Sequence, residues 1–149
     1  MPEQTEFSGS VLVVEDRRAN QTLIKLILEK IGFAVTLAED GKEAVEKALS
    51  QPFDLIFMDM QMPIMNGYEA TAVLREKDIE APIIALTAYA MKGDREKCIS
   101  AGCDDYLSKP IDHNELLKLI YKYLPMASEA TNEKVNSVYY KLRCEDRGI

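Results

Sequence analysis

The chain has 149 residues, of which 47% are hydrophobic and 29% charged, and it carries a formal net charge of −7. This length and composition predict one globular domain with its own core and exclude a wholly disordered chain. The acidic excess argues against direct binding of nucleic acid, which needs a basic surface, and no apolar stretch is long enough for membrane insertion.

Strands and helices alternate in the first half of the chain. After a loose lead-in over residues 1–10, the predicted elements are a strand at Val11–Val14, a helix at Ala19–Ile31, a strand at Ala34–Ala38, a helix at Gly41–Ser50 and a strand at Leu55–Met58. The first and third strands are short continuous apolar runs, which are typical of strands buried on both faces of a parallel sheet. The helices carry apolar residues at helical spacing on one face. The predicted inward residues are Leu23, Ile24, Ile27, Leu28 and Ile31 on the first helix and Ala44, Val45, Ala48 and Leu49 on the second.

The alternation continues in the second half. The next elements are a helix at Asn66–Glu76 with Asn66 as its N-cap, a strand at Ile83–Leu86, a helix at Lys92–Ala101, a strand at Asp105–Ser108 and a helix that Asp112 caps and Pro125 ends. Five strands and five helices in strict alternation predict an α/β domain over residues 11–125, with a doubly wound parallel sheet and helices on both faces. Residues 126–149 form a tail, for which a short amphipathic helix is predicted from Val135, Val138, Tyr139 and Leu142.

Polar side chains follow four of the five predicted strands. They are Glu15 and Asp16 after the first, Asp59 after the third, Thr87 after the fourth and Lys109 after the fifth. Because parallel strands end at the same edge of a sheet, we expect these side chains to gather there. Carboxylates held together repel one another unless a cation lies between them, and oxygen ligands suit Mg²⁺. With an ammonium and a hydroxyl beside it, such a site suits phosphoryl transfer, and Asp59 is the candidate acceptor.

The motifs at these strand ends resemble the receiver domain of two-component response regulators. They are Val13-Val14-Glu15-Asp16, Met58-Asp59-Met60-Gln61-Met62-Pro63, Asn66-Gly67, Leu86-Thr87-Ala88 and Lys109-Pro110. Their order and spacing make the resemblance specific, and it covers about Val11 to Leu124. The stretch from Asp59 to Ala70 is similar to receivers attached to hybrid histidine kinases. The resemblance implies a CheY-like, flavodoxin-like fold with strand order 2-1-3-4-5.

The resemblance also implies a role for each residue at the strand ends. Asp59 is implied to be the phosphoacceptor, and Thr87 and Lys109 are implied to contact the phosphoryl group. The implied ligands of Mg²⁺ are Asp16, Asp59 and the backbone carbonyl of Gln61, with Glu15 acting through water. Thr87 and Tyr106 are implied to form a switch in which the aromatic ring moves inward, and the Lys109–Pro110 peptide is implied to be cis.

A receiver of this kind is a signalling module that catalyses only its own phosphorylation and dephosphorylation. The implied phosphodonor is a histidine kinase or a histidine phosphotransfer protein, and the downstream target is unknown. The face formed by the fourth helix, fifth strand and fifth helix is implied to change on phosphorylation and could pair two copies of the chain. None of the three cysteines forms a C-x-x-C pair, so we expect reduced thiols in a cytoplasmic protein.

Two other functions compete with this one. A protein-binding module of the same fold that works without phosphorylation is disfavoured because every expected chemical residue is present. A phosphatase of the haloacid dehalogenase type is disfavoured because that family carries a general-acid aspartate two residues after its nucleophile, where this chain has Gln61. Receivers of hybrid kinases usually carry an uncharged pair where this chain has Arg17 and Arg18, and we expect both arginines to face solvent.

Overall fold

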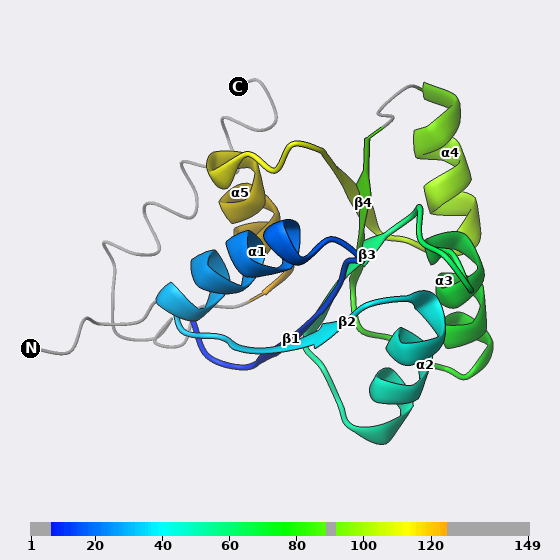
Figure 1. The fold of residues 1–149 in the computed structure, drawn as a ribbon, viewed down its shortest axis with the longest axis horizontal. Coiled ribbons are helices and arrows are strands. Elements are labelled where there is room, and N and C mark those ends of the chain that lie inside the picture. The colour runs from blue at the N-terminus through cyan, green and yellow to red at the C-terminus, as the bar shows by residue number, and fades with distance from the viewer. Residues whose placement is uncertain (1–6, 89–91, 125–149) are drawn as a thin grey trace, which may run out of the picture.

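Five strands alternate with five helices along the chain (Figure 1). The computed structural model describes residues 7–88 and 92–124. The elements are β1 (Ser10–Val14), α1 (Arg18–Lys30), β2 (Ala34–Ala38), α2 (Gly41–Ser50), β3 (Leu55–Asp59), α3 (Gly67–Glu76), β4 (Ile83–Thr87), α4 (Lys92–Ala101), β5 (Asp105–Ser108) and α5 (His113–Tyr123). The predicted tail helix lies outside the described residues, so it and the predicted domain boundaries stay predictions.

The strands form one parallel sheet in the order β2-β1-β3-β4-β5, which confirms the predicted fold. Val14 is opposite Met58, and Asp59 is opposite Leu86, so β1, β3 and β4 end close to one another. From β1 the chain continues to β2 on one side, whereas β3 lies on the other side. Ligands of open parallel sheets bind beyond the carboxyl ends of the strands at such a switch in strand order.

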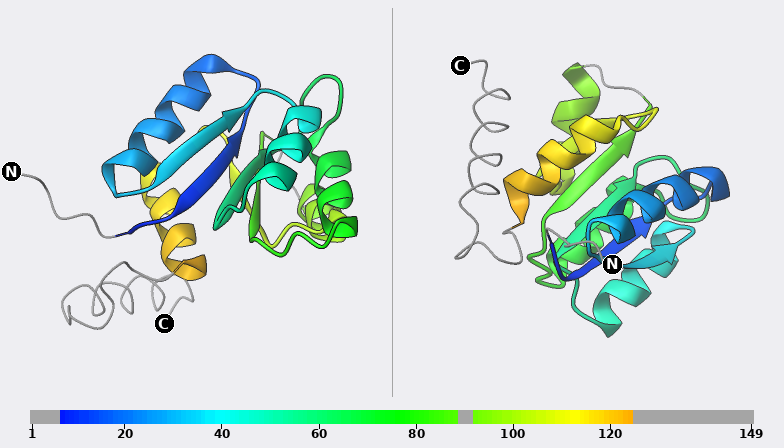
Figure 2. Two further views of the ribbon diagram at one scale, coloured as in Figure 1. Left: turned by 90° about the horizontal axis from the view of Figure 1, so that it is seen from below. Right: turned by 90° about the vertical axis from the view of Figure 1, so that its left-hand side faces the viewer.

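Helices cover both faces of the sheet. Figures 1 and 2 show α1 and α5 on one face and α2, α3 and α4 on the other. Alternate residues of β1 point to the two sides, with Val13 in the core under α1 and α5 and Val14 in the core under α2, α3 and α4. This double burial explains the continuous apolar runs in the strands. None of the helices in the described ranges is long and apolar enough to cross a bilayer.

Side-chain caps begin two helices where the sequence predicts them. The side chain of Asn66 accepts a hydrogen bond from the Glu69 N–H at 2.9 Å, and the Glu69 side chain accepts one from the Asn66 N–H at 3.1 Å. Asp112 accepts a hydrogen bond from the Glu115 N–H at 3.1 Å. Each cap supplies an acceptor for a first-turn amide that has no partner within its helix.

Two leucines predicted to face inward do not. Leu23 on α1 is 44% exposed and Leu49 on α2 is 48% exposed, so both predictions are wrong. The helix α2 packs on the sheet through Ala44 and Ala48, and Leu49 lies one residue further, about 100° around the helix axis. The buried face that helical spacing alone predicts is therefore wider than the face that packs on the sheet.

Phe7 belongs to the core although it stands in the stretch predicted to be a loose lead-in. Its side chain is fully buried, its ring stacks on Phe33, and it meets Tyr121 edge to face. Its N–H also donates to the carbonyl of Ile31 at 3.1 Å. The segment just before β1 therefore connects the end of α1 with α5.

Candidate functional site

Three carboxylates lie together at the carboxyl ends of β1 and β3. Glu15 and Asp16 follow β1 directly, and Asp59 is the last residue of β3. Each offers an oxygen within 4.8 Å of the others. Asp16 is exposed, whereas Glu15 is 0% and Asp59 2% exposed. The sequence predicted this gathering, and its oxygen-only chemistry is consistent with a Mg²⁺ site.

Lys109 lies between the two buried carboxylates. Its Nζ is 2.9 Å from Glu15 Oε1 and 3.0 Å from Asp59 Oδ2. The Lys109 N–H donates to the Thr87 carbonyl at 2.8 Å, which extends the pairing of β4 and β5 beyond the last strand residue. The peptide bond from Lys109 to Pro110 is cis, as the resemblance implies. Burial disfavours the charged amine, but both carboxylates outweigh it and raise the pKa of Lys109.

The charge of Asp59 is only partly compensated. Its Oδ1 accepts a hydrogen bond from the Gln61 N–H at 3.0 Å. Its buried Oδ2 accepts no hydrogen bond of normal geometry from the described residues, although Lys109 Nζ is 3.0 Å away. Burial and the nearby Glu15 raise the pKa of Asp59 to about 6, against the opposing effects of Gln61 and Lys109. A divalent cation would complete this environment, so the residues present fit one.

Glu15 is held more firmly than Asp59. Burial opposes its ionisation, but hydrogen bonds from Lys109 and from the Arg17 N–H outweigh burial and lower the pKa of Glu15. The Asn20 side chain donates to Glu15 Oε1 at 3.2 Å, and the Gln21 side chain donates to the Glu15 main-chain carbonyl at 2.6 Å. These contacts do not follow from the sequence pattern alone. The only hint in the sequence was the pair of amide residues, Asn20 and Gln21, in the first turn of the helix that follows the acidic residues.

Thr87 and Tyr106 lie on neighbouring strands. Thr87 ends β4 and is 3% exposed, and Tyr106 is a half-buried residue of β5. Arg95 of α4 donates a hydrogen bond to the Tyr106 hydroxyl, and its guanidinium carbon lies 4.6 Å from the centre of the ring. The sequence pattern does not predict this role of Arg95, since only the fold brings α4 beside β5. Arg17 and Arg18 are both exposed, as expected.

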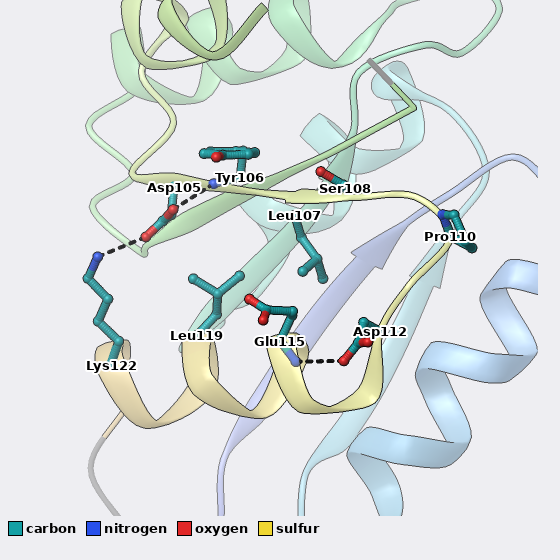
Figure 3. A pocket seen from close by; sticks show the side chains of 9 residues that line it. All are labelled: Asp105, Tyr106, Leu107, Ser108, Pro110, Asp112, Glu115, Leu119 and Lys122. Carbon is teal, nitrogen blue, oxygen red and sulfur yellow. Dashed lines mark hydrogen bonds and ion pairs between the residues drawn. The ribbon is translucent and has the colours of Figure 1, made fainter. Parts of the chain in front are cut away.

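A groove of about 340 Å³ runs along β5 and α5 (Figure 3). Leu107 points from β5 toward α5, and Tyr106 lies on the opposite side of the strand. Lys122 of α5 bridges to Asp105 of β5 at 3.0 Å. The three clustered carboxylates do not line this groove, so it is separate from the acidic site.

The sequence matches the family described as the response regulator receiver domain over residues 11–121. Hybrid signal transduction histidine kinase I of Dictyostelium discoideum is 46% identical over 89% of this chain and 9% of its own length. The signal transduction histidine-protein kinase BarA of Escherichia coli is 38% identical over 91% of this chain and 15% of its own length. The chain therefore spans only a small part of these relatives.

Two solved structures are similar over most of the described residues. The receiver domain of a sensor histidine kinase from Pseudomonas aeruginosa, with a magnesium ion coordinated in its active-site cleft, is 43% identical, with a TM-score of 0.73 over 78% of this chain and 97% of that one. The second is the Saccharomyces cerevisiae complex of the phosphotransfer protein Ypd1 with the receiver domain of its downstream response regulator Ssk1. It is 33% identical, with a TM-score of 0.76 over 80% of this chain and 91% of the matched chain.

Proposed function

Because the chain belongs to the response regulator receiver domain family, a signalling module rather than a conventional enzyme, we propose that it accepts a phosphoryl group on Asp59 in a two-component phosphorelay. The observation that carries this proposal is the environment of Asp59. Its carboxylate is buried beside Lys109 and shares an edge of the sheet with two further carboxylates, yet Oδ2 accepts no normal hydrogen bond from the described residues.

The transfer needs a nucleophile and neutralisation of charge. An oxygen of Asp59 attacks the phosphorus of a phosphohistidine, the phosphorus–nitrogen bond breaks, and its electron pair stays on the departing imidazole. Lys109 is already in contact with Asp59, so its ammonium can bind the oxygens of the transferred phosphoryl group. Thr87 can donate a hydrogen bond from its hydroxyl to the same group. Most of the rate enhancement in such a reaction comes from positioning and electrostatics.

A magnesium ion would supply the remaining positive charge. The proposed ligands are Asp16, Asp59 and the backbone carbonyl of Gln61, and Glu15 would act through water. The magnesium-bound Pseudomonas receiver supports this assignment through its 43% identity. In this chain Glu15 also forms the ion pair with Lys109, so we assign it a second task, which is to hold that ammonium near Asp59.

Phosphorylation is proposed to change the surface through Thr87 and Tyr106. New negative charge on Asp59 would draw Thr87 toward it, and Tyr106 would move into the space left behind. That motion must break the contacts between Tyr106 and Arg95 of α4. The face formed by α4, β5 and α5 would then bind the downstream protein or a second copy of the chain.

The proposed phosphodonor is a histidine kinase or a histidine phosphotransfer protein. Similarity to hybrid kinases and to the receiver crystallised with Ypd1 supports this choice. We place the domain in the cytoplasm, where kinases have access to ATP. The free thiols of Cys98 and Cys103 fit a reducing compartment.

The test is intact-protein mass spectrometry after incubation with Mg²⁺ and acetyl phosphate. We expect a gain of one phosphoryl group in the wild type and none with EDTA. Asp59→Asn should fold and remain unlabelled, because the amide has no nucleophilic oxyanion. Equal labelling of Asp59→Asn would show that the acceptor is misassigned. A folded wild type that stays unlabelled would favour the phosphorylation-independent binding module.

A further inference from the structure

Two consecutive amide side chains from the first turns of α1 hold Glu15. Asn20 Nδ2 donates to the carboxylate oxygen Oε1 at 3.2 Å. Gln21 Nε2 donates to the main-chain carbonyl at 2.6 Å, and Gln21 is 7% exposed. The other carboxylate oxygen, Oε2, accepts the Arg17 N–H at 3.0 Å. Glu15 is thus held at both oxygens and at its backbone.

The Asn20 contact reaches the same oxygen that binds Lys109. Glu15 Oε1 accepts from Asn20 and is 2.9 Å from Lys109 Nζ, which in turn is 3.0 Å from Asp59 Oδ2. A glutamate side chain has three rotatable bonds, so the ion pair alone does not determine where Oε1 lies. A neutral amide can hold that oxygen without competing for the negative charge that attracts Lys109. A cation at position 20 would compete for it.

The location of the ammonium matters because the transfer depends on positioning. A displacement of about 1 Å in a group near the reacting atoms can reduce a rate by a large factor. Lys109 is held between two carboxylates, and only one of them is proposed to react. Glu15, the carboxylate that does not react, therefore serves as the fixed partner of Lys109. Asn20 binds Glu15 but is not itself one of the reacting groups.

We propose that Asn20 is a positioning residue of the phosphoacceptor site, which holds Glu15 Oε1 so that Lys109 stands at Asp59. This inference rests on the proposed function of Asp59. The Asn20 side chain donates its hydrogen bond to Glu15 and not to Asp16 or Asp59, so it acts through Glu15 and Lys109. Gln21 supports it by fixing the main chain of Glu15.

The first test compares Asn20→Ala with Thr22→Ala, an exposed position on the same helix. With acetyl phosphate and saturating Mg²⁺, we expect the phosphorylation rate of Asn20→Ala to fall about three- to tenfold, the loss expected when one hydrogen bond of ordinary net strength is removed. The Mg²⁺ affinity from calorimetry should fall less than the rate does, because Asn20 donates to Glu15, which would reach the metal through water, rather than to a direct ligand. Thr22→Ala should match the wild type in both measurements.

The second test observes Lys109 directly. NMR of ¹⁵N-labelled lysine ammonium groups detects those protected from exchange with water, and Lys109→Arg identifies the signal. We expect a sharp Lys109 signal in the wild type and a broadened or absent one in Asn20→Ala. Asn20→Asp, which places a carboxylate against Glu15 Oε1, should show a greater loss of both rate and signal.

The outcomes separate this inference from the proposed function. A wild-type rate or an unchanged Lys109 signal in Asn20→Ala would overturn the positioning role. A parallel loss of rate and Mg²⁺ affinity would also overturn it, since that result indicates a general structural defect. If the wild type accepts no phosphoryl group, the proposed function fails, whereas the ammonium signal still reports whether Asn20 positions Lys109.

Discussion

Asp59 combines burial with incomplete compensation of its charge. The pKa of its carboxyl rises from 3.8 to about 6, because burial and the neighbouring Glu15 outweigh the Gln61 N–H and Lys109. The folded protein therefore holds this proton more tightly than the unfolded chain does. As the pH rises from about 4 through 6, ionisation of Asp59 costs the folded state free energy that the unfolded chain does not lose.

Asp59→Asn should therefore stabilise the metal-free protein at neutral pH. We expect its free energy of unfolding at about pH 7.5 to exceed that of the wild type by on the order of 2–3 kcal/mol, from the shift in the pKa of Asp59. The difference should be small below about pH 4 and constant above about pH 7, because asparagine does not titrate. Urea unfolding at a series of pH values in EDTA measures it. A difference that does not change with pH would contradict the electrostatic cause.

Asp16 is the exposed member of the acidic cluster, so its removal should affect metal binding rather than folding. We expect Asp16→Ala to weaken Mg²⁺ binding by more than about tenfold in calorimetry, since a direct carboxylate ligand is lost. Glu76→Ala, which removes the same charge from the exposed end of α3, is the control and should bind nearly as the wild type does. Equal weakening in both variants would attribute the effect to net charge.

At the scale of elements, two helix starts fix the loop that follows Asp59. The Gly41 N–H at the start of α2 donates to the Met65 carbonyl at 2.9 Å. A Cβ on Gly41 would lie 2.3 Å from that carbonyl oxygen, and a Cβ on Gly67 would lie 2.2 Å from the Asp59 carbonyl oxygen. Within this loop Ile64 has a φ of 70° and is 79% exposed. The Met65 N–H donates to the Pro63 carbonyl at 2.8 Å, which closes a γ-turn around Ile64.

Gly41→Ala should therefore loosen this loop. We expect a loss of about 1–3 kcal/mol in the free energy of unfolding, the usual cost of inserting a methyl group into a packed contact. Gly93→Ala is the matched control, because a Cβ there meets nothing within 4 Å, and the change should stabilise α4 by up to about 1 kcal/mol. Denaturant unfolding measures both. Stabilisation by Gly41→Ala would show that the loop accommodates the methyl group without any loss in the free energy of unfolding.

At the scale of the whole molecule, Phe7 joins the segment before β1 to the core under α1 and α5. Because its buried ring stacks on Phe33 and meets Tyr121, we expect Phe7→Ala to lower the free energy of unfolding by about 3–5 kcal/mol. The exposed neighbour Ser8 provides the control, and Ser8→Ala should change stability by less than about 0.5 kcal/mol. Thermal and urea unfolding of the two variants compare them. Similar small effects would mean that the domain folds without this contact.

The sequence by itself determined the elements, their order and the edge where the chemistry gathers. Apolar runs predict buried strands because both faces of this sheet are covered, and strict alternation with helices leaves a parallel sheet as the expected arrangement. In such a sheet every strand ends at the same edge. The meeting of Glu15, Asp16 and Asp59, with Lys109 beside them, could therefore be predicted without coordinates.

Only the tertiary structure decided which side chains are buried and which form hydrogen bonds or ion pairs with one another. Whether Leu49 is buried depends on how closely α2 approaches the sheet, and helical periodicity carries no such information. The contacts of Asn20 with Glu15 and of Arg95 with Tyr106 depend on distances and side-chain directions between elements. Hydrogen bonds and ion pairs act within a few ångströms, so they follow from packing, whereas strand ends follow from connectivity.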